Sequence, residues 1–328
     1  MSTSTDPQVA ERPTTKLKVK IYYECTDAGG LVHHSNYLRY FERGREHLLG
    51  QQALVRLFES TGKSFVVTSV KIAYKRGASH GDEVDVVTIP ERDGEYRLRF
   101  SQNVYRGDIL LVQGLVEMVC VDREMKLTKL PEVITGKLSF DDDDSIHKSR
   151  VLATSTTKKR LPLPSSRRKL PSDDASFLSN SSVWMKCYLD DTDFTGVCYY
   201  ANYLKWCERA RAEILSLDLL AKMRREDGVG AAIHSAELDF KRGANFGDCI
   251  LVSTRTKILS EFRVQFRHEI FRVAGDDKDR RDLLVRATVT IVCLGDGGSG
   301  TIMKIPGVFF ERIRADAAKT KRGEESEK

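Results

Sequence analysis

Hydrophobic residues recur along this chain with two spacings, one typical of helices and one typical of strands. The segments with these spacings follow one another in the same order twice. In the stretch NYLRYFERGREHLL, apolar or small residues recur every three to four positions, at Tyr37, Phe41, Gly44 and Leu48. This spacing predicts a helix with one buried face, and the small Gly44 predicts that this face lies close against a sheet. The stretch EYRLRFSQNVY alternates every second residue, which predicts a strand with one buried face.

Longer apolar runs predict the other strands of a sheet. ILLVQGLVEMVCV, over residues 109–121, and LLVRATVTIVCL, over residues 283–294, predict long strands with substantial burial. Short strands, LKVKIYY and VWMKCYL, precede the two predicted helices. One helix with several long antiparallel strands in each half predicts an α+β fold in which a sheet wraps around its helix.

An internal repeat explains why the pattern occurs twice. Asp27 and Asp193 stand 166 positions apart in two T-D-x-x-G sequences, and an N-Y-L and an E-R-x-R follow both at the same spacing. The sequence KRGA recurs at the same offset, at residues 75–78 and 241–244. A repeat of this length is too long for a solenoid unit, so each copy is predicted to be a whole domain, at 15–138 and 183–314.

The segment between the two copies, residues 139–182, is polar, charged and interrupted by prolines. It has no sustained hydrophobic period, and a loop of this length inside a compact domain would be unusual. We therefore predict a disordered linker. Residues 315–328, ADAAKTKRGEESEK, are predicted to form a flexible tail.

The overall composition is typical of a globular protein. Hydrophobic residues make up 41% and charged residues 30% of the 328 residues, and no apolar run approaches the roughly 20 residues that span a bilayer. The net charge is +6, with many basic residues in KKRLPLPSSRRK. We interpret this run as a solvated linker, with a nuclear-import or polyanion-binding patch as the alternative. Basic residues are not interleaved with aromatic ones on a predicted folded face, so nucleic acid is not expected as the main partner.

The seven cysteines indicate the compartment. Their number is odd and none forms a C-x-x-C pair, so neither a disulfide framework nor a zinc site is expected. No metal or other cofactor is predicted. The N-terminal residues lack the apolar region of a secretory signal. These features predict a reducing compartment, the cytoplasm, and leave organellar or nuclear targeting open.

The repeated motif resembles a known family. YYECTDAGGLVHHSNYLRYFERGREHLL and its counterpart in the second copy are similar to the signature of the YbgC-type and 4-hydroxybenzoyl-CoA thioesterases of the hotdog fold. The resemblance covers nearly all of both predicted domains. It implies two tandem hotdog domains, each a long helix wrapped by a curved antiparallel sheet. It also implies that the two domains pair as an intrachain pseudo-dimer with active sites at their interface.

The resemblance also assigns candidate catalytic residues. The family's catalytic carboxylate, its histidine and the tyrosine before the acidic loop match Asp27, His34 and Tyr23. In the second copy the carboxylate is Asp193, a leucine replaces the tyrosine, and Tyr200 replaces the histidine. A tyrosine at this last position resembles the hydroxybenzoyl-CoA branch, in which the backbone N–H there faces the thioester oxygen. The replacement therefore does not imply an inactive second site.

The loop and the helix start supply groups that thioester hydrolysis needs. A carboxylate such as Asp27 can attack the carbonyl carbon or activate a water molecule that does so. The first N–H groups of a helix are unpaired and partly positive, so they can stabilise the developing oxyanion. His34 can hydrogen-bond the carbonyl or tune the carboxylate. Gly30 and Gly196 allow a tight turn and a close approach of the backbone to substrate.

Other candidates have a weaker basis, and each has a structural alternative. His80, Arg92 and Lys257 can meet CoA phosphates near strand ends, although isolated surface charges are the alternative. An aspartate before a helix can be a cap or turn residue, and Tyr23 and Tyr200 can be packed aromatic residues.

The E-R-x-R sequence of each helix has a structural interpretation. The pairs Glu42–Arg45 and Glu208–Arg211 are expected to form helix-face ion pairs or interface contacts rather than to take part in chemistry. His33 is interpreted as a surface or capping residue.

The leading functional hypothesis is an acyl-CoA thioesterase that releases a free acid and CoA. An acyl-carrier-protein thioesterase and a non-catalytic acyl-CoA-binding hotdog scaffold are the alternatives. A hotdog hydratase is less favoured because the T-D-x-x-G loop fits the thioesterase branch better. The implied partners are an acyl-CoA substrate, an acyl carrier protein under the alternative, and a second chain in a homodimer of tandem chains. No membrane span is expected.

Overall fold

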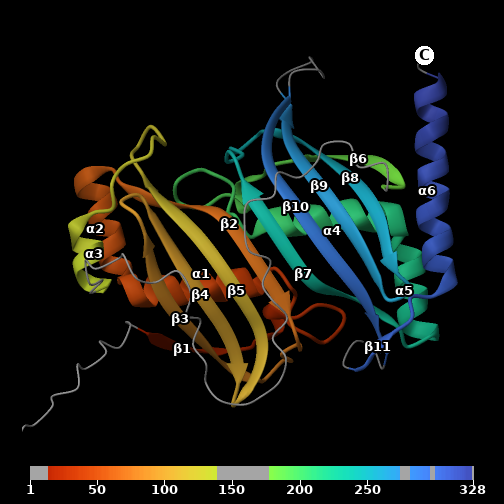
Figure 1. Cartoon of the computed structure of the whole chain (residues 1–328), viewed down its shortest axis with the longest axis horizontal. Helices are drawn as coiled ribbons and strands as arrows, with labels where there is room; N and C mark the ends of the chain where they lie inside the picture. The colour runs from red at the N-terminus through yellow and green to blue at the C-terminus, as the bar shows by residue number, and fades with distance from the viewer. Residues whose placement is uncertain (1–13, 139–176, 274–280, 296–299, 327–328) are drawn as a thin grey trace, which may run out of the picture.

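The computed structural model of the chain describes residues 14–138, 177–273, 281–295 and 300–326. Most of the predicted linker, residues 139–176, lies outside the described residues. Figure 1 shows two similar units side by side, each with a curved sheet and a long helix against one of its faces. This is the tandem hotdog architecture that the family resemblance implies.

The two units contain matching elements in the same order. The first unit consists of β1 (Thr15–Lys20), a 3-10 turn (Tyr23–Cys25), α1 (Asn36–Leu49), α2 (Gln51–Thr61), β2 (Ser64–Tyr74), β3 (Glu83–Asp93), β4 (Arg97–Arg106), β5 (Ile109–Val121) and α3 (Glu132–Leu138). The second consists of β6 (Ser179–Lys186), a 3-10 turn (Leu189–Asp191), α4 (Asn202–Leu215), α5 (Leu217–Glu226), β7 (Gly230–Phe240), β8 (Cys249–Ser260), β9 (Arg263–Val273), β10 (Arg281–Leu294), β11 (Ile302–Met303) and α6 (Gly307–Ser326).

The strands of both units form one continuous antiparallel sheet of 11 strands. Their order is β1-β3-β4-β5-β2-β7-β10-β9-β8-β6, with β11 paired to β10. The units join where residues 69–73 of β2 pair with residues 235–239 of β7. In this register Lys71 lies opposite Glu237, its own counterpart in the repeat. A pseudo-twofold axis therefore passes between these two residues, and the units form a pseudo-dimer within one chain.

The long helices α1 and α4 lie against the same face of this sheet (Figure 1). The face predicted for α1 is buried, with Tyr37, Phe41 and Gly44 all covered. A Cβ on Gly44 would lie only 2.6 Å from Thr88 Oγ1 of β3, so the helix approaches the sheet as closely as the small residue indicates. Buried residues of both units belong to one hydrophobic cluster, so the core as well as the sheet joins the two halves.

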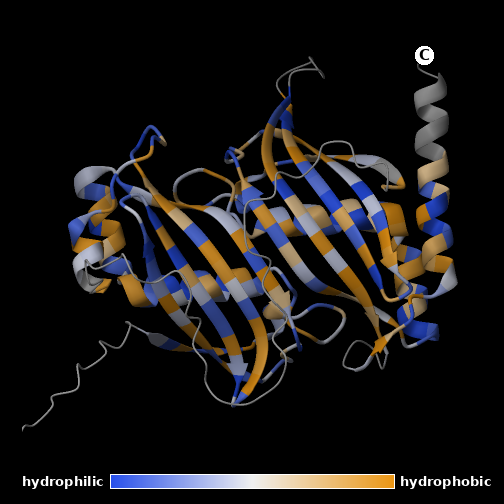
Figure 2. Cartoon of the chain, viewed as in Figure 1, coloured by the Kyte–Doolittle hydropathy of each residue, from blue (hydrophilic) through white to orange (hydrophobic). Residues whose placement is uncertain are grey.

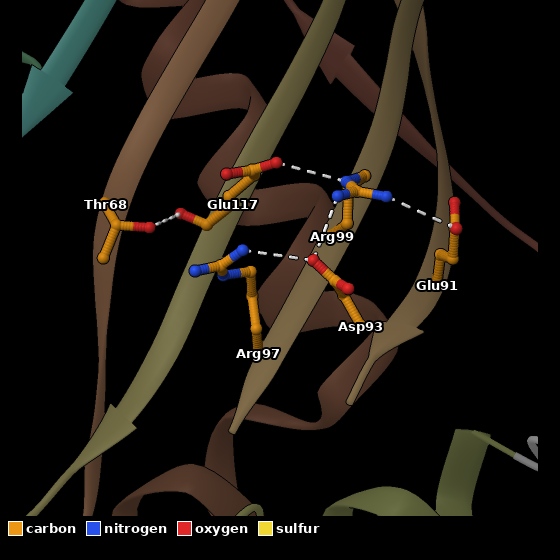
Figure 3. Close-up of polar contacts among 6 residues, drawn as sticks. All are labelled: Thr68, Glu91, Asp93, Arg97, Arg99 and Glu117. Carbon is orange, nitrogen blue, oxygen red and sulfur yellow. Dashed lines mark hydrogen bonds and ion pairs between the residues drawn. The ribbon is translucent and has the colours of Figure 1, made fainter. Parts of the chain in front are cut away.

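The opposite face of the sheet carries charged side chains. In β4, Leu98 and Phe100 are fully buried, whereas Arg97 and Arg99 lie on the other face. Arg99 contacts acidic side chains of β3 and β5, with 3.2 Å between its Nε and Glu117 Oε1 (Figure 3). Alternating hydrophobic and hydrophilic bands run along the strands in Figure 2. The predicted alternation is confirmed, and it explains how an antiparallel sheet has one face on the core and one in water.

A second helix follows each long helix, which the sequence analysis did not separate. The backbone turns at Gly50 with φ +85° before α2, and at Ser216 with φ +68° before α5. Glycine adopts this conformation readily, but serine does so rarely, and so the second break has no clear sequence signal. No helix among the described residues is long and apolar enough to cross a membrane.

The C-terminal region differs from the expected flexible tail. Helix α6 begins at Gly307, is anchored by the buried Phe309 and Ile313, and continues to Ser326. Once these apolar residues fix its first turns, the alanines and lysines that follow favour continuation of the helix. The second copy also begins slightly earlier than expected, because β6 starts at Ser179.

Gly114 of β5 provides a test of the close packing between helix and sheet. A Cβ on Gly114 would lie 2.2 Å from the ring of Phe41, whereas the matching positions of the second copy hold the larger Ala287 and the smaller Cys207. We expect Gly114→Ala to lower the free energy of unfolding by about 1–3 kcal/mol through overpacking, as measured by urea denaturation.

The second copy supplies the matched control for this substitution. Ala287→Gly is expected to cost about 1 kcal/mol, and Phe41→Leu combined with Gly114→Ala is expected to recover part of the loss. Unchanged stability in Gly114→Ala would contradict the close contact.

Candidate active sites between the two copies

The two acidic loops have the same backbone structure. In the first, Asp27 Oδ1 accepts a hydrogen bond from the Gly29 N–H at 2.6 Å, and the Gly30 N–H donates to the Asp27 carbonyl at 2.9 Å. Gly30 has φ +72° and Gly196 has φ +80°, which side-chain-bearing residues rarely adopt. Asp193 makes the equivalent turn in the second loop. The two glycines are needed for the turn itself, and their contact with substrate stays a prediction.

The first loop leads into α1 at a junction that leaves a backbone donor unpaired. The Asn36 side chain donates to the Cys25 carbonyl at 2.9 Å. An asparagine at a helix start often caps the helix, but this one fixes the loop instead. The Ala78 N–H donates to the Tyr37 hydroxyl at 3.0 Å, which holds the helix start on the sheet. Among the described residues, the His34 N–H has no acceptor. The junction thus combines an exposed carboxylate with a free donor.

The long helix of the opposite copy contacts each loop. His33 Nε2 lies 2.6 Å from Glu208 Oε2 of α4, and His33 Nδ1 lies 2.8 Å from Ser35 Oγ. At the pseudo-symmetric place, the Tyr199 hydroxyl donates to the Glu42 carboxylate of α1. Both contacts cross between the copies, so the opposite copy places a carboxyl group beside each loop.

His34 and Tyr200 occupy equivalent positions but have different surroundings. His34 Nε2 is buried and lies 3.8 Å from Glu208 Oε2, and the ring also interacts with the Leu204 backbone of α4, the counterpart of Leu38. The Tyr200 hydroxyl donates to the Leu38 carbonyl and accepts a hydrogen bond from Arg45 Nη2 at 3.1 Å. Both side chains therefore turn toward the long helix of the opposite copy, and the Tyr200 hydroxyl has two hydrogen-bond partners there.

Burial and charge shift the pKa values of the two cross-copy carboxyl groups in opposite directions. Burial alone would raise the pKa of Glu208, but the hydrogen bond from His33 and nearby positive charges lower this pKa to about 2. Burial raises the pKa of Glu42, and a hydrogen bond from a tyrosine opposes that rise only partly. Burial also holds the pKa of His34 well below its usual value. At neutral pH, Glu208 is therefore ionised and His34 is neutral.

His33, His34 and Glu208 also form a set of potential metal ligands. One ligand atom from each lies within 4.8 Å of the others, and two imidazoles with a carboxylate suit zinc or iron(II). The direct His33–Glu208 contact already engages two of these atoms. The prediction that no cofactor is required stays a prediction.

The sequence was compared with models of protein families. A family model described as "Thioesterase-like superfamily" matches residues 22–138 and again residues 187–313. Each match covers one copy of the repeat, and together they cover most of the chain. The chain belongs to the thioesterase-like superfamily.

Curated relatives of this thioesterase-like chain match the length of one copy. The chain is 34% identical over 119 residues to an acyl-CoA thioesterase YbgC of Haemophilus influenzae, covering 35% of this chain and 88% of that protein. It is 33% identical over 126 residues to an acyl-CoA thioester hydrolase YbgC of Escherichia coli O6:H1, covering 36% of this chain and 91% of that protein. The resemblance to YbgC-type proteins and the assignment to the thioester hydrolases are thereby confirmed.

Two solved structures match both units of the thioesterase-like chain at once. The 12:0-ACP thioesterase from Umbellularia californica has a TM-score of 0.61 at 14% identity, covering 85% of this chain and 93% of that chain. An acyl-ACP thioesterase from Bacteroides thetaiotaomicron has a TM-score of 0.55 at 13% identity, covering 85% of this chain and 98% of that chain. At these identities the likeness shows the fold alone, and it confirms the tandem arrangement.

The structure brings some of the other predicted residues of this thioesterase together. The exposed Tyr23 ring stacks on His80, with 3.9 Å between the ring centroids. Arg92 Nε donates to the Gly94 carbonyl at 3.0 Å in the turn after β3. Lys257 Nζ lies 5.7 Å from the centre of the Phe177 ring. The last two contacts involve neither acidic loop, and the roles of these residues in CoA binding stay predictions.

Sequence reasoning missed the side chains that cross between copies. The E-R-x-R residues make contacts between the copies, as one of their two interpretations expects: Glu208 contacts His33, and the buried Arg45 contacts Tyr200. Arg45 also donates to Gln102 Oε1 of its own copy at 2.7 Å. His33 is not a free surface residue, since it joins the two copies. The repetition of E-R-x-R was a signal, but its spacing alone does not show which residue faces the other copy.

Replacing Glu208 tests the charge contact between the copies. Because its folded pKa is lowered from 4.5 to about 2, its ionised form stabilises the fold above pH 4.5, and this contribution is lost as the pH falls toward 2. We expect Glu208→Gln to lower the free energy of unfolding by about 1 kcal/mol at pH 7, since the carboxylate is partly exposed. Urea denaturation at pH 7 and pH 4 should show a smaller difference at the lower pH.

Glu42→Gln is the matched control. Its raised pKa means that ionised Glu42 does not stabilise the fold, so this variant is expected to keep wild-type stability at pH 7. An equal loss in both variants would contradict the assigned charges.

Proposed function

We propose that this chain hydrolyses acyl-CoA thioesters to a free acid and CoA, with Asp27 as the reacting carboxylate in the first site. The observation that carries this proposal is the junction of the acidic loop with α1. There an exposed Asp27 and an unpaired His34 N–H belong to one loop. The names of the YbgC relatives support acyl-CoA as the substrate class.

The chemistry follows from these groups. The Asp27 carboxylate either attacks the thioester carbonyl carbon or takes a proton from a water molecule that attacks it. The negative charge that develops on the carbonyl oxygen is stabilised by the His34 N–H and by the start of α1. The carbon–sulfur bond then breaks, and the CoA thiolate takes up a proton. If Asp27 is the nucleophile, water hydrolyses the resulting anhydride in a second step.

We propose that the second loop is also a working site, with Asp193 as its carboxylate. Asp193 makes the same turn as Asp27, and among the described residues the Tyr200 N–H also lacks an acceptor. The Tyr200 hydroxyl is already engaged, so only its backbone serves the carbonyl oxygen in this proposal.

An acyl-carrier-protein thioesterase would use the same groups, because both substrates present an acyl thioester. Two structural neighbours are named as ACP thioesterases, but their similarity supports the fold alone. Rates measured with one acyl group on CoA and on an acyl carrier protein would decide between them, and a higher kcat/KM on the carrier protein would overturn the acyl-CoA assignment.

Single substitutions of the two carboxylates test the proposed function. Asp27→Asn and Asp193→Asn are each expected to lower kcat partially, and the double variant is expected to lose at least about a hundredfold, the scale of acid–base catalysis. Steady-state assays of thiol release over acyl-CoAs of several lengths and one aromatic acyl-CoA provide the measurement.

Binding provides the control for these variants. Each should keep its affinity for a non-hydrolysable acyl-CoA analogue, because asparagine preserves the shape of the loop. Full turnover in the double variant would overturn the assignment of both carboxylates, and full turnover in Asp193→Asn on every substrate would make the second loop structural.

The homodimer of tandem chains can be tested by mass in solution. The chain has a mass of 37.1 kDa, and we expect light scattering to give twice this value. A mass of one chain would contradict the prediction, while the pseudo-dimer within the chain would still supply both sites.

A further inference from the structure

The two acidic loops differ at the residue after the aspartate. The first loop has Ala28 and the second has Phe194. The Phe194 ring packs edge-on against Phe58 of α2 in the other copy, with 5.7 Å between the ring centroids. Phe194 is nevertheless 82% exposed, so most of its surface is open to a ligand. The second loop therefore carries an exposed phenylalanine against the half-buried Phe58, whose ring also has the Arg123 guanidinium 5.9 Å from its centroid.

The counterpart of Phe58 in the repeat is Arg224 of α5. Arg224 approaches the first loop from the other copy, and its Nη1 lies 3.2 Å from the position that a Cβ on Gly29 would occupy. Among the described residues, this half-buried guanidinium has neither an ion-pair partner nor a hydrogen-bond acceptor. The same Cβ position lies 2.5 Å from Asp27 Oδ1, so the guanidinium stands near the Asp27 carboxylate without forming an ion pair with it. The first loop thus has a small side chain and a guanidinium where the second has two phenylalanines.

The neighbouring positions show the same contrast. Tyr23 and His80 stack beside the first loop, and their counterparts beside the second are the exposed Leu189 and Phe246. The loop that contains Phe246 is joined to the second acidic loop by a β-bridge between residues 197 and 245. At these positions the side chains beside the first loop are polar, and those beside the second are apolar.

We propose that the two sites of this thioesterase prefer different thioesters. The Asp27 site binds an anionic group of its substrate through Arg224 of the second copy. The Asp193 site binds an apolar acyl group against Phe58 and Phe194. This inference rests on the proposed function, since it assigns substrate classes to the same two sites.

The physical basis is the difference between a guanidinium and a phenyl ring. An unpaired guanidinium forms charge-assisted hydrogen bonds with carboxylate or phosphate oxygens, frequently through two parallel bonds. Exposed phenyl rings gain free energy when an apolar ligand removes them from water. Either a carboxylate at the far end of the acyl chain or a phosphate of CoA can supply the anion at Arg224.

Exchange of the two residues tests the proposal one site at a time. In an Asp193→Asn background, which leaves the Asp27 site, Arg224→Gln and Arg224→Phe are expected to lower kcat/KM for an anionic thioester by about tenfold, the loss of one hydrogen bond to a charged group. In an Asp27→Asn background, Phe58→Arg is expected to lower kcat/KM for a neutral long-chain acyl-CoA and to raise it for one that ends in a carboxylate.

Two pairs of substrates identify the source of the anion. The first pair is two acyl-CoAs of equal chain length, of which one ends in a carboxylate. The second pair is one neutral acyl group on CoA and on N-acetylcysteamine, which carries no phosphate. A loss confined to the carboxylate-ending substrate assigns Arg224 to the acyl group. A loss on every CoA thioester, but not on N-acetylcysteamine thioesters, assigns it to a CoA phosphate.

Matched controls separate a binding role from a structural one. Arg225, the exposed neighbour of Arg224, does not approach the loop, so Arg225→Gln is expected to leave kcat/KM unchanged. Arg224→Lys keeps the positive charge and should retain part of the preference. Thermal melting of each variant should show that the fold is intact. Unchanged kcat/KM for every CoA thioester, including the one that ends in a carboxylate, in both Arg224→Gln and Arg224→Phe would overturn the proposal.

A binding measurement distinguishes failure of this inference from failure of the proposed function. Calorimetry with a non-hydrolysable thioether analogue of the carboxylate-ending acyl-CoA reports binding without turnover. If both aspartate variants keep full activity but Arg224→Gln weakens binding of the analogue about tenfold, the anion site stands while the catalytic assignment fails. If the aspartate variants lose activity but neither binding nor the substrate ratio depends on Arg224, the catalytic assignment stands and the anion site is overturned.

Discussion

The antiparallel pairing of β2 with β7 is the contact on which the rest of the structure depends. It joins two half-sheets into one and sets the pseudo-twofold axis between Lys71 and Glu237. That axis places each long helix beside the acidic loop of the other copy, so Glu208 meets His33. A shift of one residue in this register would turn each strand's core side chains to the other face of the sheet. The burial pattern of both units therefore fixes the register, and the register fixes the sites.

Covalent duplication allows the two halves to differ where a symmetric dimer cannot. In a homodimer, Lys71 would lie opposite another Lys71, and like charges directly opposite each other destabilise a strand pair. Here Glu237 takes the second position. The cores have diverged in the same compensating way, because a phenylalanine faces Gly114 in one unit while the matching positions of the other hold a cysteine and Ala287. Once the halves are inequivalent in packing, their sites can also be inequivalent in chemistry.

The inequivalence is clearest in the electrostatics of the cross-copy carboxyl groups. A hydrogen bond from His33 lowers the pKa of Glu208, whereas burial raises the pKa of Glu42, which faces a phenol. The same pair of positions thus provides a carboxylate paired with a histidine beside the first loop and a buried carboxyl group paired with a tyrosine beside the second. An unpaired Arg224 stands near the first loop, and Phe58 stands near the second. These differences arise from a few substitutions on a shared backbone.

Much of this protein can be derived from local pattern. The repeat, the helix with its small residue at Gly44, the alternating strand around Leu98, and the acidic loops with Asp27 and Asp193 are all encoded within short stretches, because periodicity and turn chemistry act over a few residues. The contacts of Glu208 with His33, of Tyr200 with α1, and of α5 with the first loop join residues far apart in the sequence. No local rule places them together, since a charge at a given helical position can face water or a partner equally well. The pairing of the two units decides whether such a charge faces water or the other copy. It thereby also decides the chemical character of each site.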